Sequence, residues 1–125
     1  MTDARRAVEV QVTNNTPADL SVRSAVTNGT SSLWMHGQQA DSGQVVKQWD
    51  SVTWGVFTNS EADAASATVS IGGLGNSAID LNLDKLPDGT GSVVANSNDE
   101  IQATVTQIDD TDNHAIWRVV LSPLR

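Results

Sequence analysis

Apolar and polar residues alternate along most of this chain with a period of two. Valines alternate with polar residues over Val8–Val12, and the same pattern returns over Trp117–Leu121 near the end of the sequence. Side chains at positions i and i+2 of an extended chain share a face, so this pattern predicts strands with one buried and one wetted face. No segment of helical period is long enough to connect parallel strands. The pattern therefore predicts an all-β protein.

Residues that favour turns separate the alternating segments at short intervals. Asn28-Gly29 fits a type I′ hairpin turn, which would return Ser31–His36 antiparallel to the preceding strand. At the end of the chain we expect Ile101–Val105 to pair with Ala115–Leu121 across a short loop. The spacing predicts a two-sheet antiparallel β-sandwich of about nine or ten strands with little or no helix. We find no repeat or linker, so residues 1–125 are expected to form a single domain.

The charge balance narrows the range of partners. Seven Lys and Arg residues against fifteen Asp and Glu residues give a net charge of −8, which repels phosphate backbones and anionic lipid surfaces. Nucleic acid is therefore not expected as a partner, and membrane recognition would have to use neutral head groups. The chain has no cysteine, no recognisable signal peptide and no long apolar run. We expect a soluble protein, either cytoplasmic or released to the extracellular space.

Catalytic and metal-binding patterns are weak. The densest group of oxygen ligands is Asp109, Asp110 and Asp112, which are weak candidates for calcium and also ordinary hairpin-tip residues. We therefore predict no metal and no cofactor. The enzymatic alternative is a hydrolytic arrangement of His36 with Asp41 or Ser42, but the sequence lacks a Gly-x-Ser-x-Gly elbow. We predict that the chain is not an enzyme.

The four tryptophans fall into two groups. Trp54 and Trp117 are in phase with neighbouring apolar residues and are predicted to be core residues. Trp34 and Trp49 stand beside polar loops and are the candidates for an exposed surface, together with Phe57. An exposed indole suits stacking on sugars and insertion at lipid interfaces, because it combines a large apolar body with one polar group.

The order of several short segments resembles the aegerolysin family over about the first two thirds of the chain. The segments that carry the resemblance are Val10–Thr16, Leu20, Gly29–Trp34, Trp49, Thr58–Glu61 and Val69–Gly72. The resemblance implies a small acidic β-sandwich that recognises sphingolipid head groups, in some members together with a larger pore-forming protein. It matches Trp34 and Trp49 to tryptophans that flank the family's second and third strands. It also matches Thr58 and Glu61 to a Thr-Gly-x-Glu-Gly turn.

These observations lead to one main hypothesis and two alternatives. The main hypothesis is a non-enzymatic protein that recognises a neutral lipid head group or glycolipid at a membrane, as the targeting component of a two-part toxin. The predicted ligand-binding residues are Trp34, His36, Gln38, Trp49, Phe57 and Glu61. The first alternative is a lectin-like carbohydrate-binding module that uses the same indoles, helped by Asp109, Asp110 and Asp112 with or without calcium. The second is a structural protein whose strand edges join copies in a homo-oligomer.

Overall fold

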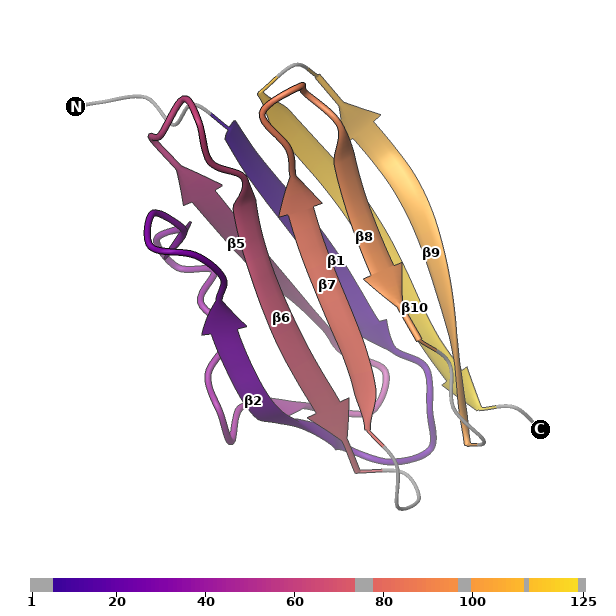
Figure 1. Ribbon diagram of the computed structural model, residues 1–125. Coiled ribbons are helices and arrows are strands. Elements are labelled where there is room, and N and C mark those ends of the chain that lie inside the picture. The colour runs from indigo at the N-terminus through magenta and orange to yellow at the C-terminus, as the bar shows by residue number, and fades with distance from the viewer. Residues whose placement is uncertain (1–5, 74–77, 97–99, 112, 124–125) are drawn as a thin grey trace.

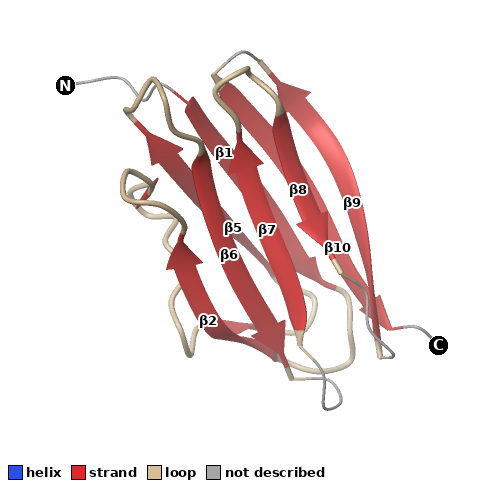
Figure 2. Ribbon diagram, viewed as in Figure 1, coloured by secondary structure: helices blue, strands red, loops and turns tan. Residues whose placement is uncertain are grey.

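The computed structural model describes residues 6–73, 78–96, 100–111 and 113–123, and these residues form ten strands in two layers (Figures 1 and 2). The strands are β1 (Arg6–Asn14), β2 (Leu20–Thr27), β3 (Leu33–Trp34), β4 (Val45–Val46), β5 (Ser51–Thr58), β6 (Ala65–Gly72), β7 (Ile79–Lys85), β8 (Gly91–Ala95), β9 (Ile101–Asp110) and β10 (His114–Pro123). Sheet A has the order β3-β5-β1-β10-β9, and sheet B has the order β4-β2-β6-β7-β8. None of the described residues is helical, and the predicted two-sheet sandwich is confirmed.

The core lies between the two sheets and follows the predicted alternation. Val8, Val10 and Val12 of β1 are fully buried, as is Trp54 of β5. The Trp54 indole Nε1 donates a hydrogen bond to Gln44 Oε1 at 3.1 Å, so its polar group is satisfied inside the protein. The sequence therefore correctly predicted which face of these strands is buried.

The predicted C-terminal hairpin is also confirmed. Strands β9 and β10 are antiparallel, with Val105 opposite Val119 and Ala103 opposite Leu121. The register shifts between Ile116 and Trp117, so the strands are not regularly paired along their whole length. Trp117 is partly buried and packs against the core, on the side that its phase predicts.

One pairing departs from the antiparallel prediction. Strands β1 and β10 lie side by side in the middle of sheet A and run parallel, with Val10 opposite Trp117. Parallel neighbours need a long connection. Here the connection is the whole chain between Asn14 and His114, which builds the rest of the sandwich, so no crossover helix is needed.

The predicted hairpin at Asn28-Gly29 is wrong. Strand β2 pairs with β4 and β6 in sheet B, whereas β3 pairs with β5 in sheet A. Gly29 has a positive φ of 79°, but Asn28 does not, and a type I′ turn requires both. The Asn28 side chain instead donates to the hydroxyls of Ser66 and Thr68 on β6, each at 3.0 Å. This segment therefore crosses from one sheet to the other.

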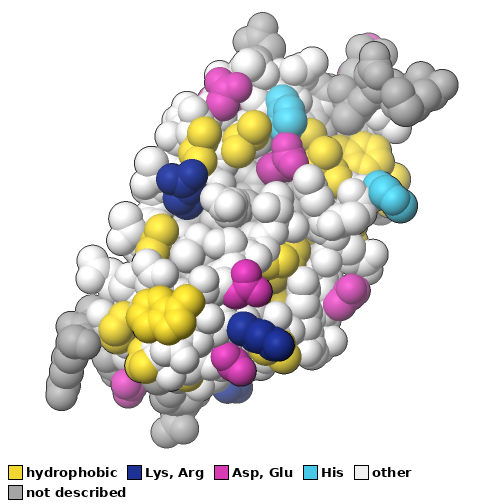
Figure 3. All heavy atoms as spheres, turned by 180° about the vertical axis from the view of Figure 1, so that it is seen from behind, with side chains coloured by type: hydrophobic (Ala, Val, Ile, Leu, Met, Phe, Trp, Pro, Cys, Tyr) yellow, Lys and Arg dark blue, Asp and Glu magenta, His cyan; other side chains and the backbone are white. Residues whose placement is uncertain are grey.

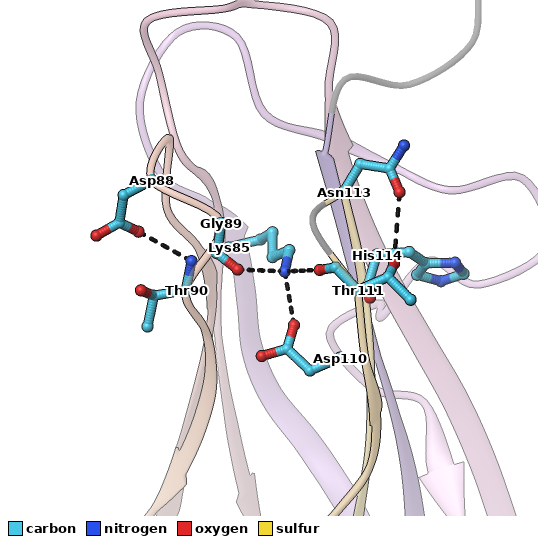
Figure 4. A network of polar contacts seen from close by, with 8 residues as sticks. All are labelled: Lys85, Asp88, Gly89, Thr90, Asp110, Thr111, Asn113 and His114. Atoms are coloured by element: carbon cyan, nitrogen blue, oxygen red, sulfur yellow. Dashed lines mark hydrogen bonds and ion pairs between the residues drawn. The ribbon is translucent and has the colours of Figure 1, made fainter.

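A buried ion pair joins the two sheets at one end of the sandwich (Figure 4). The Lys85 side chain, at the end of β7, is 0% exposed, and its Nζ lies 2.6 Å from Asp110 Oδ1 at the end of β9. The same ammonium donates to the carbonyl oxygens of Gly89 and Thr111. The three N–H donors of the buried Lys85 ammonium thus each have an acceptor. Alternation along the sequence does not predict this contact, although Lys85 is in phase with the buried Leu83.

Asp88 lies in the hairpin turn beside Lys85 and accepts a hydrogen bond within that turn. Its Oδ1 accepts a hydrogen bond from the Thr90 backbone N–H at 2.9 Å (Figure 4). This bond, with a further one from the Thr90 side chain and the charge of Lys85, lowers the pKa of Asp88 below its ordinary value of 3.8. A lowered pKa in the folded state means that the ionised carboxylate stabilises the fold at pH values above the unfolded pKa. That contribution is lost as the pH falls through the folded pKa.

We therefore expect Asp88→Ala to lower the melting temperature near neutral pH and to have little effect in acid. The reason is that the carboxylate loses its charge as the pH falls through its folded-state pKa, which lies below the ordinary value of 3.8. Thermal unfolding of both proteins at neutral pH and at about pH 2 tests this expectation. An equal difference in melting temperature at the two pH values would contradict it.

Candidate functional site

The most exposed tryptophan lies on a tight turn at one end of the sandwich. Strand β4 ends at Val46, and the chain reverses at residues 47–50. The Asp50 N–H donates to the Lys47 carbonyl oxygen at 3.0 Å, which closes a four-residue turn. Trp49 occupies the third position of this turn, and its side chain is 66% exposed to solvent.

The backbone of Trp49 has an unusual conformation. Its φ is +68°, and it is the only described residue other than glycine with a positive φ. A positive φ at the third position is typical of type II turns, which favour glycine or asparagine there. A bulky residue in this region of φ/ψ space is a genuine outlier and is strained.

Two neighbouring turns of the chain show what this geometry normally requires. Gln38 N–H donates to Met35 O, and Gln44 N–H donates to Asp41 O, each at 3.0 Å. In both turns the third residue has a positive φ, and in both it is glycine: Gly37 with +76° and Gly43 with +91°. Of the three turns, only the one at residues 47–50 carries a large side chain at its third position.

Hydrogen bonds from outside the turn hold it in place. Gln48 N–H donates to Asp19 Oδ1 at 2.9 Å, and Trp49 N–H donates to the Asn14 carbonyl oxygen at 2.7 Å. Ser51 N–H donates to Asp50 Oδ1 at 2.9 Å. Together with the closing bond from Asp50, every backbone N–H from residue 48 to residue 51 has an acceptor. The turn is therefore well braced.

Asn14, whose carbonyl oxygen accepts the Trp49 N–H, is itself held in place by several hydrogen bonds. It is fully buried, and its side-chain amide donates to the carbonyl oxygens of Ala18 and Val46 at 2.8 and 2.9 Å. Its Oδ1 accepts from the Thr16 N–H and the Thr16 hydroxyl, at 3.0 and 2.6 Å. All hydrogen-bonding positions of the amide are used. The end of β1 that contacts Trp49 is thereby tied to two other segments.

The structure separates Trp49 from Trp34. Trp34 lies opposite Val56, which in turn lies opposite Val8, so it is on the inward side of sheet A. It is half-buried and packs against the core. Val8 and Asn14 are six residues apart on β1, about 20 Å at a rise of about 3.3 Å per residue. The two indoles therefore do not form one contact surface.

The remaining predicted site residues lie toward the β3–β5 edge and the far end of sheet A. Phe57 is half-buried and lies opposite Leu33, which is exposed, and His36 is exposed in the turn that follows β3. The Gln38 side chain lies directly over Gly55, where an added Cβ would come within 2.2 Å of Gln38 Oε1. The absence of a side chain at Gly55 makes room for this contact. No protein atom among the described residues hydrogen-bonds to Gln38 Oε1, which is buried.

Glu61 lies in the exposed turn between β5 and β6. The Arg6 guanidinium donates to the backbone carbonyl oxygens of Ser60, Glu61 and Asp63. Arg6 is the first residue of β1, whereas Asn14 is the last, so Glu61 and Trp49 lie toward opposite ends of the sandwich. The role of this turn in ligand binding stays a prediction.

The calcium candidates do not assemble into a site in the part of the chain that the structure describes. Asp110 is paired with Lys85, and Asp112 lies outside the described residues. Asp109 lies opposite Ile116, one position along β9 from Asp110, so the two carboxylates point to opposite faces of the sheet. No group of three or more described His, Asp or Glu residues could hold a metal ion.

A histidine and a carboxylate meet on the outer face of sheet A. His114 Nε2 contacts Glu9 Oε2, and the His114 side chain is partly exposed. The hydrogen bonds of the described residues place no hydroxyl on this imidazole. His36 is not part of the pair. Among the described residues, this pair therefore has no hydroxyl partner of the kind that a hydrolytic triad contains.

An open hollow of about 430 Å³ lies between the outer face of sheet B and the loops at residues 28–31 and 63–64. Asp63 and Asp84 line it with Asn28, Ser31 and Ser66. The Ser31 hydroxyl lies 3.0 Å from Asp63 Oδ2, and the Ser66 hydroxyl donates to Asp84 Oδ1 at 2.7 Å. The described lining contains no Lys, Arg or aromatic residue.

The fold and the exposed turn define a two-sheet β-sandwich with one prominent surface indole. This fold is shared by several solved structures, including the following two. One is IP-1A from Alcaligenes faecalis, with a TM-score of 0.66 and 14% identity, over 98% of this chain and 94% of that chain. The other is the RahU protein in complex with a Tris molecule, with a TM-score of 0.73 and 10% identity, over 98% of this chain and 97% of that chain.

At these identities the likeness shows the fold alone. No family model matches the chain, and no curated protein sequence matches it. The described residues also contain no helix of the length and apolarity that crossing a bilayer would require. Any statement about a ligand therefore rests on the residues themselves.

Proposed function

We propose that this chain is a non-enzymatic, aegerolysin-like binding protein that recognises a neutral lipid head group or glycolipid at a membrane. Trp49 is the central contact, and a larger pore-forming protein is the proposed partner in a two-part toxin. The observation that supports this proposal is a large exposed indole held on a strained but fully hydrogen-bonded turn. Strain retained at a position that packs no core is characteristic of functional residues.

The distribution of charge supports a neutral target. Of the basic side chains, Arg6 and Lys85 are buried and engaged in contacts within the fold. They therefore contribute little to surface recognition, and the chain as a whole carries a net charge of −8. Such a surface is repelled by anionic lipids, whereas an indole inserts at neutral interfaces through its apolar area.

Hydrophobic groups on the outer face of sheet A form separate patches rather than one continuous surface (Figure 3). Polar, acidic, basic and histidine side chains lie between these patches. A single anchoring indole accords better with this distribution than a broad apolar interface does. We therefore place the contact at the Trp49 turn.

Co-sedimentation with zwitterionic vesicles, with and without sphingolipid, and with anionic vesicles tests the proposal. We expect binding to neutral vesicles with a blue shift of tryptophan emission. Trp49→Ala should weaken binding roughly 30-fold, as for loss of a hot-spot contact of about 2 kcal/mol. Leu33→Ala, which removes another exposed apolar side chain on the β3 edge, is the matched control and should leave binding unchanged.

Failure of the wild-type protein to bind any of the vesicles would overturn the lipid proposal. Equal binding by the Trp49→Ala variant and the wild-type protein would instead remove Trp49 from the contact.

The carboxylates, hydroxyls and amide that line the hollow beside sheet B favour a second candidate function, a lectin-like module. The carboxylates accept hydrogen bonds and the hydroxyl and amide groups can also donate them, a combination that matches the hydroxyls of a sugar. A glycan array, run with and without a chelator, separates this candidate from lipid recognition. Glycan binding that is abolished by Asp84→Asn and retained in Trp49→Ala would favour the hollow.

A further inference from the structure

We infer that Asp19 is a positioning residue that holds Trp49 in its binding conformation. This inference rests on the proposed function, because it takes the Trp49 indole to be the ligand contact. Asp19 is the residue immediately before β2, so its carboxylate belongs to a different segment of the chain from the Trp49 turn. Asp19 acts through the turn and is not itself proposed to touch the ligand.

The strained turn has an obvious alternative conformation. If the peptide plane between Gln48 and Trp49 rotates by about 180°, the type II turn becomes a type I turn. Trp49, the third residue of the turn, then has a negative φ. That rotation would relieve the strain at Trp49 and redirect its side chain. The same rotation turns the Trp49 N–H away from Asn14 O, so it would break the 2.7 Å hydrogen bond between them. The strained state therefore depends on contacts from outside the turn.

Asp19 supplies the second of these contacts. Its Oδ1 accepts the Gln48 N–H at 2.9 Å, which fixes the residue immediately before the peptide that would rotate. Asn14 also braces the turn, but it is fully buried, and replacing it would leave several buried groups without partners. Asp19 is exposed, and water can replace its carboxylate. The brace at Asp19 can therefore be removed without disturbing the core.

The experiment compares Asp19→Ala, Asp19→Asn and Asp88→Ala with the wild-type protein. Asparagine retains an oxygen that can accept the Gln48 N–H, so Asp19→Asn is the conservative rescue. Asp88→Ala removes a similar carboxylate-to-backbone bond from a distant turn and is the matched control. Amide exchange of residues 48–51 reports the turn. Fluorine NMR of 5-fluorotryptophan protein, with the Trp49 signal identified by Trp49→Phe, reports the indole.

We expect Asp19→Ala to speed exchange at Gln48 and Trp49 and to shift or broaden the Trp49 resonance. Its binding to neutral vesicles should fall about three- to tenfold, the size expected when a segment must be ordered on binding. Asp19→Asn and Asp88→Ala should resemble the wild-type protein in all three measurements. A role in folding alone would not produce this pattern, because it would lower the melting temperature without selective change at Trp49.

Two results would overturn the inference. One is unchanged exchange and an unchanged Trp49 resonance in Asp19→Ala, which needs no lipid to observe. The other is a loosened turn with full vesicle affinity. If the wild-type protein binds no vesicle, the proposed function fails instead, and the exchange data alone decide whether Asp19 holds the turn.

Discussion

Replacing Asp110 by alanine is expected to lower the free energy of unfolding by about 3 kcal/mol. The change leaves the ammonium of Lys85, which is 0% exposed, without its counter-charge. Removing one partner of a buried ion pair typically costs about 3–5 kcal/mol, and the lower end applies because Asp110 is partly exposed. Urea unfolding of the variant and the wild-type protein measures the difference.

A double-mutant cycle separates the ion pair from other effects of the substitution. Lys85→Met combined with Asp110→Ala should be more stable than the sum of the two single losses predicts, by at least about 1.5 kcal/mol. Asp109→Ala changes the adjacent carboxylate on the opposite face and should stay within about 0.5 kcal/mol of the wild-type protein. Simple additivity in the cycle would show that Lys85 and Asp110 are not coupled.

Replacing Trp49 by glycine is expected to raise stability and abolish most binding. Glycine adopts positive φ without steric cost, so the strain of about 1–2 kcal/mol is relieved. The greater freedom of glycine in the unfolded chain offsets part of this gain, which leaves a net increase of about 1 kcal/mol. Affinity for neutral vesicles should fall roughly 30-fold, because the indole is lost. Urea unfolding and vesicle co-sedimentation measure the two effects.

The neighbouring turn at residues 41–44 offers the reciprocal control. Gly43 has a φ of +91°, and an added Cβ would meet no atom within 4 Å, so Gly43→Ala introduces backbone strain without a clash. It should lower stability by about 1 kcal/mol and leave vesicle binding unchanged. If Trp49→Gly proved markedly destabilising, Trp49 would be a packing residue and the argument from strain would fail.

The candidate site could be predicted only in part. Trp49 is predicted as a surface indole because it stands among polar residues, and it is highly exposed. Trp34 is also predicted as a surface residue, but it lies opposite Val56 and packs on the core. The strand that contains Trp34 has only two residues, so alternation along it cannot indicate which side faces inward.

The groups that hold the Trp49 turn could not be predicted. Asp19 and Asn14 contact it from 29 and 35 positions earlier in the chain. Nothing in the local sequence marks a left-handed tryptophan, because the neighbouring turns of the same kind carry glycine. Such a conformation is stable only when distant groups supply its hydrogen bonds.

Alternation in the sequence was sufficient to predict most of the longer strands and their buried faces, and therefore the two-layer architecture. Alternation is a local property, since it depends only on the geometry of an extended chain and on the transfer of apolar side chains out of water. The tertiary structure decided which strands became neighbours, including the parallel pair of β1 and β10, and which polar groups met. The Lys85–Asp110 pair and the hydrogen bonds that hold the Trp49 turn are among these tertiary features. Each joins residues that only the folded chain brings within hydrogen-bonding distance.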